Sequence, residues 1–400
     1  MQSERVRQIG FSPTLKVSGL AKRMAAEGRD VLDLSVGQPD FPSPQVVKEA
    51  GHRAIEENRT GYTPTVGIPE LRAEIAAKLH RENGVEYEME NIIVSPGAKA
   101  TLYFLALTLF ERGDEVIIPS PYWVTYPEQV RMAEAKPVFL PSREENGFRL
   151  TASELDAAIT PQTKAVILNY PSNPTGACYT QKELADLAAV CRERDIWVVA
   201  DEIYEKLVYD GLEFGTIAAV HPDMRERTII VNGMSKAFSM TGWRLGWAAG
   251  PRDVISGMGK IQSHSTSNPT SISQWAGLEA LRSAADDVAA MVKEFQVRRN
   301  LMVEGLRNLP GVTCALPAGA FYTFPNFSAY RGATAKRTRV ESDQDLAMYL
   351  LEEAEVAVVP GEAFGSPFNL RISYAAPRKR LVEGLRRMEY ALTKLEKEEA

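Results

Sequence analysis

The sequence GMSKAFSMTGWRLG at residues 233–246 follows directly on the apolar run TIIV at residues 228–231. Short apolar runs of this kind alternate with longer helical patterns along most of the chain, which is typical of a mostly parallel sheet with helices on both faces. The runs predicted as strands are NIIV (91–94), EVII (115–118), AVIL (165–168), IWVVA (196–200), TIIV and LGWAAG (245–250). We therefore expect an α/β fold that binds its ligands at the carboxyl ends of the strands.

Two helical patterns lie between these strands. Residues 98–110 are predicted to form a buried helix. Residues 180–194 are predicted to form an amphipathic helix that opens with a capping box between Thr180 and Glu183.

The chain changes character after about residue 285. Residues 285–309 are predicted as a long charged helix. After it we expect a polar, charged loop at 331–342 and strands near 312–315, 320–324, 356–359 and 370–373. A chain of 400 residues is longer than one ordinary domain. We predict an N-terminal segment (1–45) that packs on the small domain or on a partner subunit, a large domain (46–285) and a small α+β domain (286–400).

Composition excludes several classes of protein. Apolar residues make up 44% of the chain and charged residues 24%, which rules out a disordered chain, a collagen-like repeat and a coiled coil. Lys and Arg total 46 against 52 for Asp and Glu, and the net charge of −6 gives no general affinity for nucleic acid or anionic membrane. The N-terminus lacks the apolar region of a signal peptide, and the longest stretch without charged residues is rich in polar residues. We expect a cytoplasmic protein without a membrane span.

Metal and nucleotide motifs are absent from the sequence. The three cysteines form no C-x-x-C pair, which suits a reducing compartment, and the four histidines are scattered without metal-ligand spacing. The motifs G-x-G-x-x-G, P-loop, G-x-S-x-G and H-E-x-x-H do not occur. We therefore expect no metal site, and neither a dinucleotide-binding domain nor a Ser/His/Asp hydrolase.

Lys236 lies just past the end of the TIIV strand. Its neighbours in sequence are Gly, Ser, Ala and Phe, and the nearest cation along the chain is Arg244, which could hold a phosphate. A lysine that is partly desolvated near another cation has a lowered pKa and can attack a carbonyl to form a Schiff base. The residues alone leave open two interpretations, this nucleophile and an ordinary solvated lysine.

Three further strand ends carry residues that suit a cofactor. Asp201 follows IWVVA with Tyr204 three residues on, and an anion there suits the pyridine nitrogen of a pyridoxal ring, although an isolated Asp more often caps a helix. The sequence NPTG at 173–176 follows AVIL, and a simple turn is its alternative interpretation. Gly97, at the start of the helix after NIIV, offers free backbone N–H groups to an anion such as phosphate.

Together these segments resemble the fold-type I pyridoxal phosphate (PLP) enzymes, and specifically the class I aminotransferases. The resemblance covers nearly the whole chain in the family's order. The matching segments are VLDLSVGQPDF (31–41), TGYTPTVGIPELR (60–72), SPGAK (95–99), YW (122–123), NPTG (173–176), DEIY (201–204), SKAFSMTGWRLG (235–246) and NLRISY (369–374). The fold it implies is that of the fold-type I PLP-dependent transferases, with a mostly parallel central sheet flanked by helices and a smaller α+β domain.

The resemblance also implies how the cofactor is held. Lys236 would bind PLP and later move a proton between the substrate α-carbon and the cofactor, while Asp201 would keep the pyridine nitrogen protonated. Tyr62 would reach the phosphate from the other subunit of a homodimer. The other implied cofactor contacts are Asn173 and Tyr204 at the ring O3′, Trp123 stacked on the ring, and Arg244 with Gly97, Ala98 and Lys99 at the phosphate. Many family members have a serine where this chain has Gly233, so Ser235 is the candidate replacement donor.

The same resemblance implies a set of substrate contacts. Arg371 would bind the α-carboxylate as a bidentate pair, aided by the backbone of Gly37. A bacterial and archaeal subgroup of aspartate aminotransferases reads the distal carboxylate with a lysine and a threonine, and Lys99 and Thr14 look like that pair. A dicarboxylic substrate needs such a second cation, because its charge would otherwise stay unpaired. The full implied set is Thr14, Gly37, Lys99, Trp123, Asn173 and Arg371.

The activity that follows from the resemblance is transamination of L-aspartate and 2-oxoglutarate to oxaloacetate and L-glutamate by a ping-pong mechanism. Conversion of prephenate to arogenate stays open as a second activity. The alternatives are an aminotransferase for aromatic amino acids or alanine, and a PLP-dependent lyase or decarboxylase, which sequence separates poorly. A PLP-sensing transcription regulator would need an added DNA-binding domain, for which the match within the first forty residues leaves no room.

Overall fold

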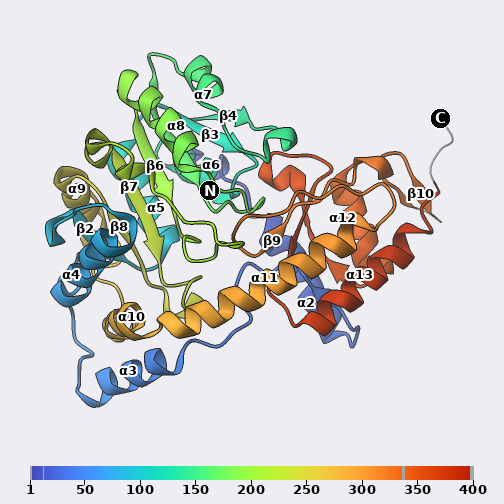
Figure 1. Cartoon of the computed structure of the whole chain (residues 1–400), viewed down its shortest axis with the longest axis horizontal. Helices are drawn as coiled ribbons and strands as arrows, with labels where there is room; N and C mark the ends of the chain where they lie inside the picture. Colours follow the sequence, from blue (N-terminus) through green and yellow to red (C-terminus); the bar gives the residue numbers. More distant parts are fainter. Residues whose placement is uncertain (1, 12, 336–337, 397–400) are drawn as a thin grey trace.

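The computed structural model describes residues 2–11, 13–335 and 338–396. Its centre is a seven-stranded sheet with the order β2-β8-β7-β6-β5-β3-β4 (Figure 1). The strands are β2 (Ile92–Ser95), β3 (Glu115–Ser120), β4 (Lys136–Pro141), β5 (Thr163–Asn169), β6 (Trp197–Asp201), β7 (Thr228–Gly233) and β8 (Gly246–Ala249). Strands β7, β6, β5, β3 and β4 are parallel, whereas β8 runs antiparallel to both of its neighbours. The expected mostly parallel α/β sheet is confirmed.

Strand β4 is missing from the sequence-based prediction. Its residues include Pro137 and Pro141, and proline is disfavoured inside a sheet because it has no N–H to donate. The strand tolerates both prolines because it lies at the edge of the sheet, with β3 as its one paired neighbour.

Alternate residues of each strand build a core on each face of the sheet. In β6, Val199 packs with one set of helices and its neighbour Val198 packs with the other set. The helices on the first face are α5 (Ala98–Leu109), α6 (Thr125–Met132) and α9 (Arg252–Ser263). Those on the second face are α4 (Pro69–Lys78), α7 (Ala152–Ala158), α8 (Gln181–Glu193) and α10 (Ser271–Ser283). Both faces of the sheet are therefore buried, as a parallel sheet requires.

Helices α8 and α5 begin where the sequence predicts. The side chain of Thr180 accepts a hydrogen bond from the backbone N–H of Glu183, and the Glu183 carboxylate accepts one from the N–H of Thr180. This is the expected capping box. Helix α5 begins at Ala98, directly after Gly97, so its free N–H groups point toward the end of the sheet that carries the predicted site residues.

The C-terminal region is built on a small three-stranded antiparallel sheet. Its strands are ordered β13 (Val359–Pro360), β14 (Leu370–Ser373) and β9 (Tyr322–Thr323). Helices α12 (Asp343–Glu353) and α13 (Arg378–Leu392) pack around it, and α11 (Ala285–Arg307) runs across the molecule from the large sheet to this region (Figure 1). The strand expected at 312–315 is instead a single bridge between Thr313 and Asn326, and the loop expected at 331–342 contains the short paired strands β10 (Thr334–Ala335) and β11 (Thr338–Arg339).

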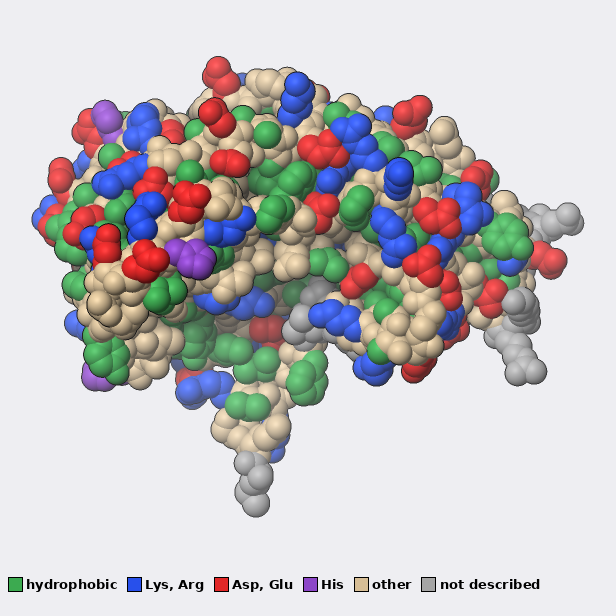
Figure 2. Space-filling model, turned by 90° about the horizontal axis from the view of Figure 1, so that it is seen from below, with side chains coloured by type: hydrophobic (Ala, Val, Ile, Leu, Met, Phe, Trp, Pro, Cys, Tyr) green, Lys and Arg blue, Asp and Glu red, His purple; other side chains and the backbone are tan. Residues whose placement is uncertain are grey.

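The N-terminal segment reaches both parts of the molecule. After α1 (Glu4–Arg7) and α2 (Pro13–Ala26), strand β1 (Leu32–Asp33) pairs in parallel with β12 (Val356–Ala357) of the C-terminal region. The chain then crosses without regular structure to α3 (Gln45–Glu56), which packs on α10. Seen from below, the N-terminal segment projects from the body beside a hollow in which hydrophobic side chains gather, with basic and acidic side chains among them (Figure 2).

Among the described residues, no helix is long and apolar enough to cross a membrane. The division of the chain at residues 45 and 285 stays a prediction.

Candidate active site

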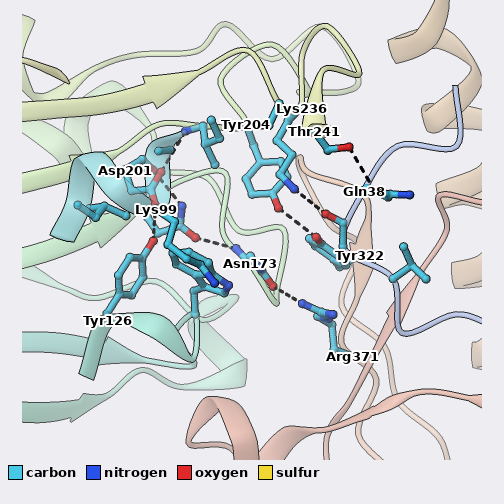
Figure 3. Close-up of a pocket in the computed structure, with 18 of the residues that line it drawn as sticks. Gln38, Lys99, Tyr126, Asn173, Asp201, Tyr204, Lys236, Thr241, Tyr322 and Arg371 are labelled. Carbon is cyan, nitrogen blue, oxygen red and sulfur yellow. Dashed lines mark hydrogen bonds between the residues drawn. The ribbon is translucent and has the colours of Figure 1, made fainter. Parts of the chain in front are cut away.

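A cavity of about 450 Å³ opens at the carboxyl ends of β5, β6 and β7 (Figure 3). The strand ends supply Asn169, Asp201 and Lys236, and the C-terminal region supplies Tyr322 and Arg371. The predicted site residues that line this cavity are Gly37, Ala98, Lys99, Trp123, Asn173, Asp201, Tyr204, Ser235, Lys236, Arg244 and Arg371. Segments more than 300 residues apart in sequence, 35–38 and 371, thus face one cavity.

The amine of Lys236 enters the cavity just past the end of β7 (Figure 3). Its Nζ donates a hydrogen bond of 2.5 Å to the backbone oxygen of Gly37. Burial, followed by the positive charges of Arg371 and Arg244, lowers the pKa of this amine to about 7. A large fraction of the lysine is therefore the neutral amine near neutral pH, which is the form that attacks a carbonyl.

Asp201 is buried at the last position of β6, and two donors hold its carboxylate. Oδ2 accepts a hydrogen bond of 2.6 Å from the Tyr126 hydroxyl, and Oδ1 accepts one of 3.2 Å from the backbone N–H of Ile203. Burial raises the pKa of Asp201 to about 6, and the two hydrogen bonds oppose that rise. The result is a fixed, desolvated acid facing the same cavity as Lys236.

The start of α5 and Arg244 form a cradle for an anion. Gly97 has a φ of 90°, and a Cβ added there would lie 2.3 Å from the Arg244 guanidinium. A Cβ at Gly246 would lie 2.2 Å from the backbone N of Ala98. Both glycines therefore keep side chains away from the free N–H groups of α5, where a phosphate gains from the N–H groups and from the arginine.

Steric crowding explains why this chain has glycine at position 233, where many family members have a serine. A Cβ at this position would lie 2.8 Å from the backbone oxygen of Leu245 and 2.9 Å from the Cα of Gly246. The close pairing of β7 with β8 therefore leaves no room for a serine here without a backbone shift. Ser235 is buried and lines the cavity, so it remains the candidate donor.

Arg371 is buried in β14, and its guanidinium reaches two neutral oxygens. Nη1 donates a hydrogen bond of 3.0 Å to Asn173 Oδ1, and Nη2 donates one of 2.7 Å to the backbone oxygen of Ser35. Nε has no hydrogen-bond partner among the described residues. The group also stacks over the Tyr322 ring, 4.6 Å from its centroid. A substrate carboxylate would bind this cation more strongly than its neutral partners do.

Lys99 lies on the side of the cavity away from Arg371 (Figure 3), and Trp123 lies beside it. The Lys99 amine sits 4.9 Å from the centroid of the Trp123 ring. Partial desolvation and the charge of Arg244 lower the pKa of Lys99. Its position at the cavity, in the first turn of α5, is compatible both with substrate and with phosphate binding.

Two tyrosines of the cavity were missed by the sequence analysis. Tyr126 lies one helical turn after Trp123, and this spacing in YWVTY is a signal that could have identified it. Tyr322 lies in β9 outside every matched segment, so the sequence offers no comparable signal. Its hydroxyl lies 3.0 Å from that of Tyr204, and a Cβ at Gly37 would lie 3.2 Å from the same oxygen.

Three predicted site residues do not line the cavity. Gly97 is the N-cap of α5, directly before Ala98, which does line it. Tyr62 is 94% exposed, so its assignment to the site of another subunit stays a prediction. Thr14 lies in the first turn of α2, and its side chain is outside the described residues. No cluster of side chains suited to a metal ion occurs in the part of the chain that the structure describes.

Comparison with known proteins identifies the family. Residues 29–387 match the family described as aminotransferase class I and II. The chain is 48% identical to an aspartate aminotransferase of Geobacillus stearothermophilus, over 93% of this chain and 94% of the relative. It is 47% identical to an aspartate/prephenate aminotransferase of Cereibacter sphaeroides, over 97% of each chain.

Solved structures agree with this result. An aspartate aminotransferase from Rhizobium meliloti superposes with a TM-score of 0.95 at 44% identity, covering 99% of both chains. The enzyme of Thermus thermophilus with maleate gives a TM-score of 0.92 at 41% identity, covering 98% of this chain and 99% of that one. The chain belongs to the class I and II aminotransferases. This family implies PLP as the cofactor and amino acids and 2-oxo acids as substrates.

The pKa of Lys236 predicts how the cofactor-free protein takes up PLP. Because the pKa lies near 7 rather than 10.5, the neutral amine is lost as the pH falls through 7. The uptake rate should fall about fivefold from pH 7 to pH 6 and level off above about pH 8. Visible absorbance after mixing measures this rate. A rate that keeps rising about tenfold per pH unit up to pH 10 would mean an ordinary lysine and contradict the prediction.

Proposed function

We propose that this protein is a PLP-dependent aspartate aminotransferase, converting L-aspartate and 2-oxoglutarate to oxaloacetate and L-glutamate. The observation that carries this proposal is the arrangement of one cavity, in which Lys236 and Asp201 lie with two further cations, Arg371 and Lys99 (Figure 3). A dicarboxylic amino acid presents two carboxylates and an amine, and this set of groups offers a partner to each.

The residues present fit the cofactor. The free N–H groups of α5 and Arg244 would hold the phosphate, and Asp201 would pair with the pyridine nitrogen. Asn173 and Tyr204 would contact the ring oxygen, and Trp123 would stack on the ring. When bound, PLP supplies an electron sink and carries the amino group between the two half-reactions. A ping-pong order follows from that storage of the amino group.

Lys236 has the properties of the proton carrier. Its pKa of about 7 lets Nζ accept a proton from the substrate α-carbon and pass it on without a large energetic cost in either step. Gly37 accepts its hydrogen bond, which orients Nζ within the cavity. Tyr126 fixes Asp201, so the acid keeps its orientation when a ring nitrogen pairs with it.

Arg371 and Lys99 divide the recognition of the substrate. Arg371 is buried, is held in place by Asn173 and Ser35, and suits the α-carboxylate as a planar fork. Lys99 lies elsewhere on the cavity wall and suits the distal carboxylate. Aromatic and alanine donors would leave Lys99 without a partner.

A homodimer with shared sites is part of the proposal. Tyr62 is 94% exposed and Phe11 is fully exposed, although large aromatic side chains of this kind are normally covered. The N-terminal segment projects from the body, and a cavity of about 890 Å³ lies between it and helices α5 and α6 (Figure 2). A second copy of the chain would cover these groups and bring Tyr62 to its partner's phosphate cradle.

The proposal is tested by the visible absorption of the protein with PLP, recorded before and after addition of L-aspartate alone. Loss of the absorption of the Lys236-bound cofactor, with release of oxaloacetate, is the expected result. Lys236→Ala should give neither signal while remaining folded. Release of ammonia or carbon dioxide without oxaloacetate would indicate a lyase or a decarboxylase. Prephenate is tested by adding it after L-aspartate and measuring whether the original absorption returns. Relatives named for aspartate and prephenate match this chain at similar identity.

Lys99→Ala should separate dicarboxylic from neutral donors. Loss of one charged hydrogen bond should lower kcat/KM for L-aspartate about 30-fold, while kcat/KM for L-alanine changes less than about threefold. The matched control is Lys182→Ala, which removes an exposed lysine of α8 far from the cavity. Equal losses for both donors would instead assign Lys99 to the phosphate.

Mixed dimers test the role of Tyr62. A Lys236→Ala subunit and a Tyr62→Ala subunit are each expected to form weakly active or inactive homodimers. In an equal mixture, about a quarter of all sites would combine an intact Lys236 with an intact Tyr62 from its partner, so activity should recover to about a quarter of normal. Activity after unfolding and refolding the mixture measures this recovery. No gain over the separate variants would place Tyr62 outside the shared site.

A further inference from the structure

Two segments of chain cross between the large sheet and the C-terminal region. One is α11, and the other is residues 34–44, which lead from β1 to α3. The second segment is anchored at both ends. Leu34 exchanges backbone hydrogen bonds with Ala357 and Ser373, and Ser43 bonds to Ser239 and Trp243. Between these anchors it has no helix or strand to fix its position.

The part of this segment between its anchors, residues 35–43, carries two backbone oxygens that accept hydrogen bonds from the site's cations Arg371 and Lys236. Ser35 O accepts from Arg371, and Gly37 O accepts from Lys236. We refer to residues 35–43 as the acceptor loop. Because the loop has no regular structure, the positions of these two oxygens depend on side-chain contacts along it, which include those of Ser35 with Asp33 and of Gln38 with Thr241.

Arg298, in the middle of α11, supplies such a contact. It is 6% exposed, and its Nη1 donates a hydrogen bond of 2.7 Å to Oδ1 of Asp40 in the acceptor loop. Its guanidinium also lies over the ring of Phe41, 4.9 Å from the centroid, and Phe41 packs edge-on against Phe295 of α11 at 5.3 Å. One arginine therefore holds two consecutive residues of the loop, one by charge and one by stacking.

The same arginine is tied to the C-terminal region. Its Nε donates a hydrogen bond of 2.8 Å to Glu294, and Glu294 also accepts a hydrogen bond of 2.9 Å from Arg378 at the start of α13. The hydrogen bond from Arg378, which contributes most, and that from Arg298 lower the pKa of Glu294 to about 2. Glu294 therefore carries its charge at any physiological pH. Arg298 thus joins the acceptor loop, α11 and α13.

We infer that Arg298 is a positioning residue for substrate binding, which holds the acceptor loop through Asp40 and Phe41 so that Ser35 O and Gly37 O keep Arg371 and Lys236 aimed into the cavity. This inference rests on the proposed function, since it concerns the grip on a dicarboxylic substrate. Arg298 itself does not line the cavity. Its effect is therefore expected in substrate affinity more than in turnover at saturation.

The neighbouring residue provides a matched control. Arg299 is 1% exposed and forms a comparable fork, with bonds of 2.7 and 2.8 Å to Asp210 and one of 3.0 Å to the backbone oxygen of Pro317. None of these partners belongs to the acceptor loop. Asp210→Asn therefore weakens an arginine–carboxylate pair on the same helix without touching the loop.

The experiment compares Arg298→Met, Asp40→Asn and Asp210→Asn in the PLP-loaded protein. We expect Arg298→Met to raise KM for L-aspartate and the calorimetric Kd for maleate about tenfold each, with kcat changed less than about twofold. Asp40→Asn should raise both about threefold, and the double variant should be no worse than Arg298→Met, because the two residues act as one pair. Asp210→Asn should lower Tm while leaving KM and Kd unchanged.

The outcomes separate this inference from the proposed function. A parent protein that neither transaminates aspartate nor binds maleate overturns the proposed function. A parent protein that does both, with Arg298→Met and Asp40→Asn behaving like Asp210→Asn, overturns the inference alone. If Arg298→Met does not fold, Asp40→Asn decides the matter, because its partly exposed side chain can be changed with little loss of packing. Arg298→Lys, which can pair with one carboxylate but not both, should fall between the parent and Arg298→Met.

Discussion

The site depends on holding four cations in one cavity without carboxylate partners, of which Arg371 is buried whereas Arg244 and Lys99 are exposed. Lys236, Arg371, Arg244 and Lys99 all line it, and among the described residues none of the four is ion-paired to a carboxylate. Their mutual repulsion affects the chemistry of Lys236. Its burial, and then the positive charges of Arg371 and Arg244, lower its pKa to about 7. The lack of carboxylate partners also leaves the cavity short of negative charge, so anionic ligands bind with little competition from the protein.

Other buried cations of the molecule do have carboxylate partners. Arg298 and Arg299 are nearly inaccessible to solvent, and each pairs with at least one carboxylate at 2.7–2.8 Å. Lys78, also buried, bonds to Glu205 and Asn83. A buried charge normally needs such a partner, since removing it from water is costly. The presence of a carboxylate partner therefore distinguishes these buried cations from the four that line the cavity.

The sequence predicts most of this arrangement where the signal is local. The strand ends that carry Asp201 and Lys236 are short apolar runs followed by small or polar residues, and the parallel sheet brings them together. The sequence does not predict Tyr322 in the cavity, because a tyrosine within a strand is usually a core residue. Contacts between distant residues, such as Asp40 with Arg298, leave no local pattern at all. Strand β4 was missed for the opposite reason, since its prolines give a misleading local signal.

The acceptor loop contacts both Arg371 and Lys236 through very few bonds. Ser35 and Gly37 are two residues apart, and each peptide unit between them is a rigid plane. A displacement of the whole loop would move Ser35 O relative to Arg371 and Gly37 O relative to Lys236 at the same time. The lack of regular structure in the loop leaves both oxygens free to point into the cavity, where a helix or strand would have used them in its own hydrogen bonds. The position of the loop must then come from its anchors and from α11, which explains why an interaction outside the cavity bears on the geometry within it.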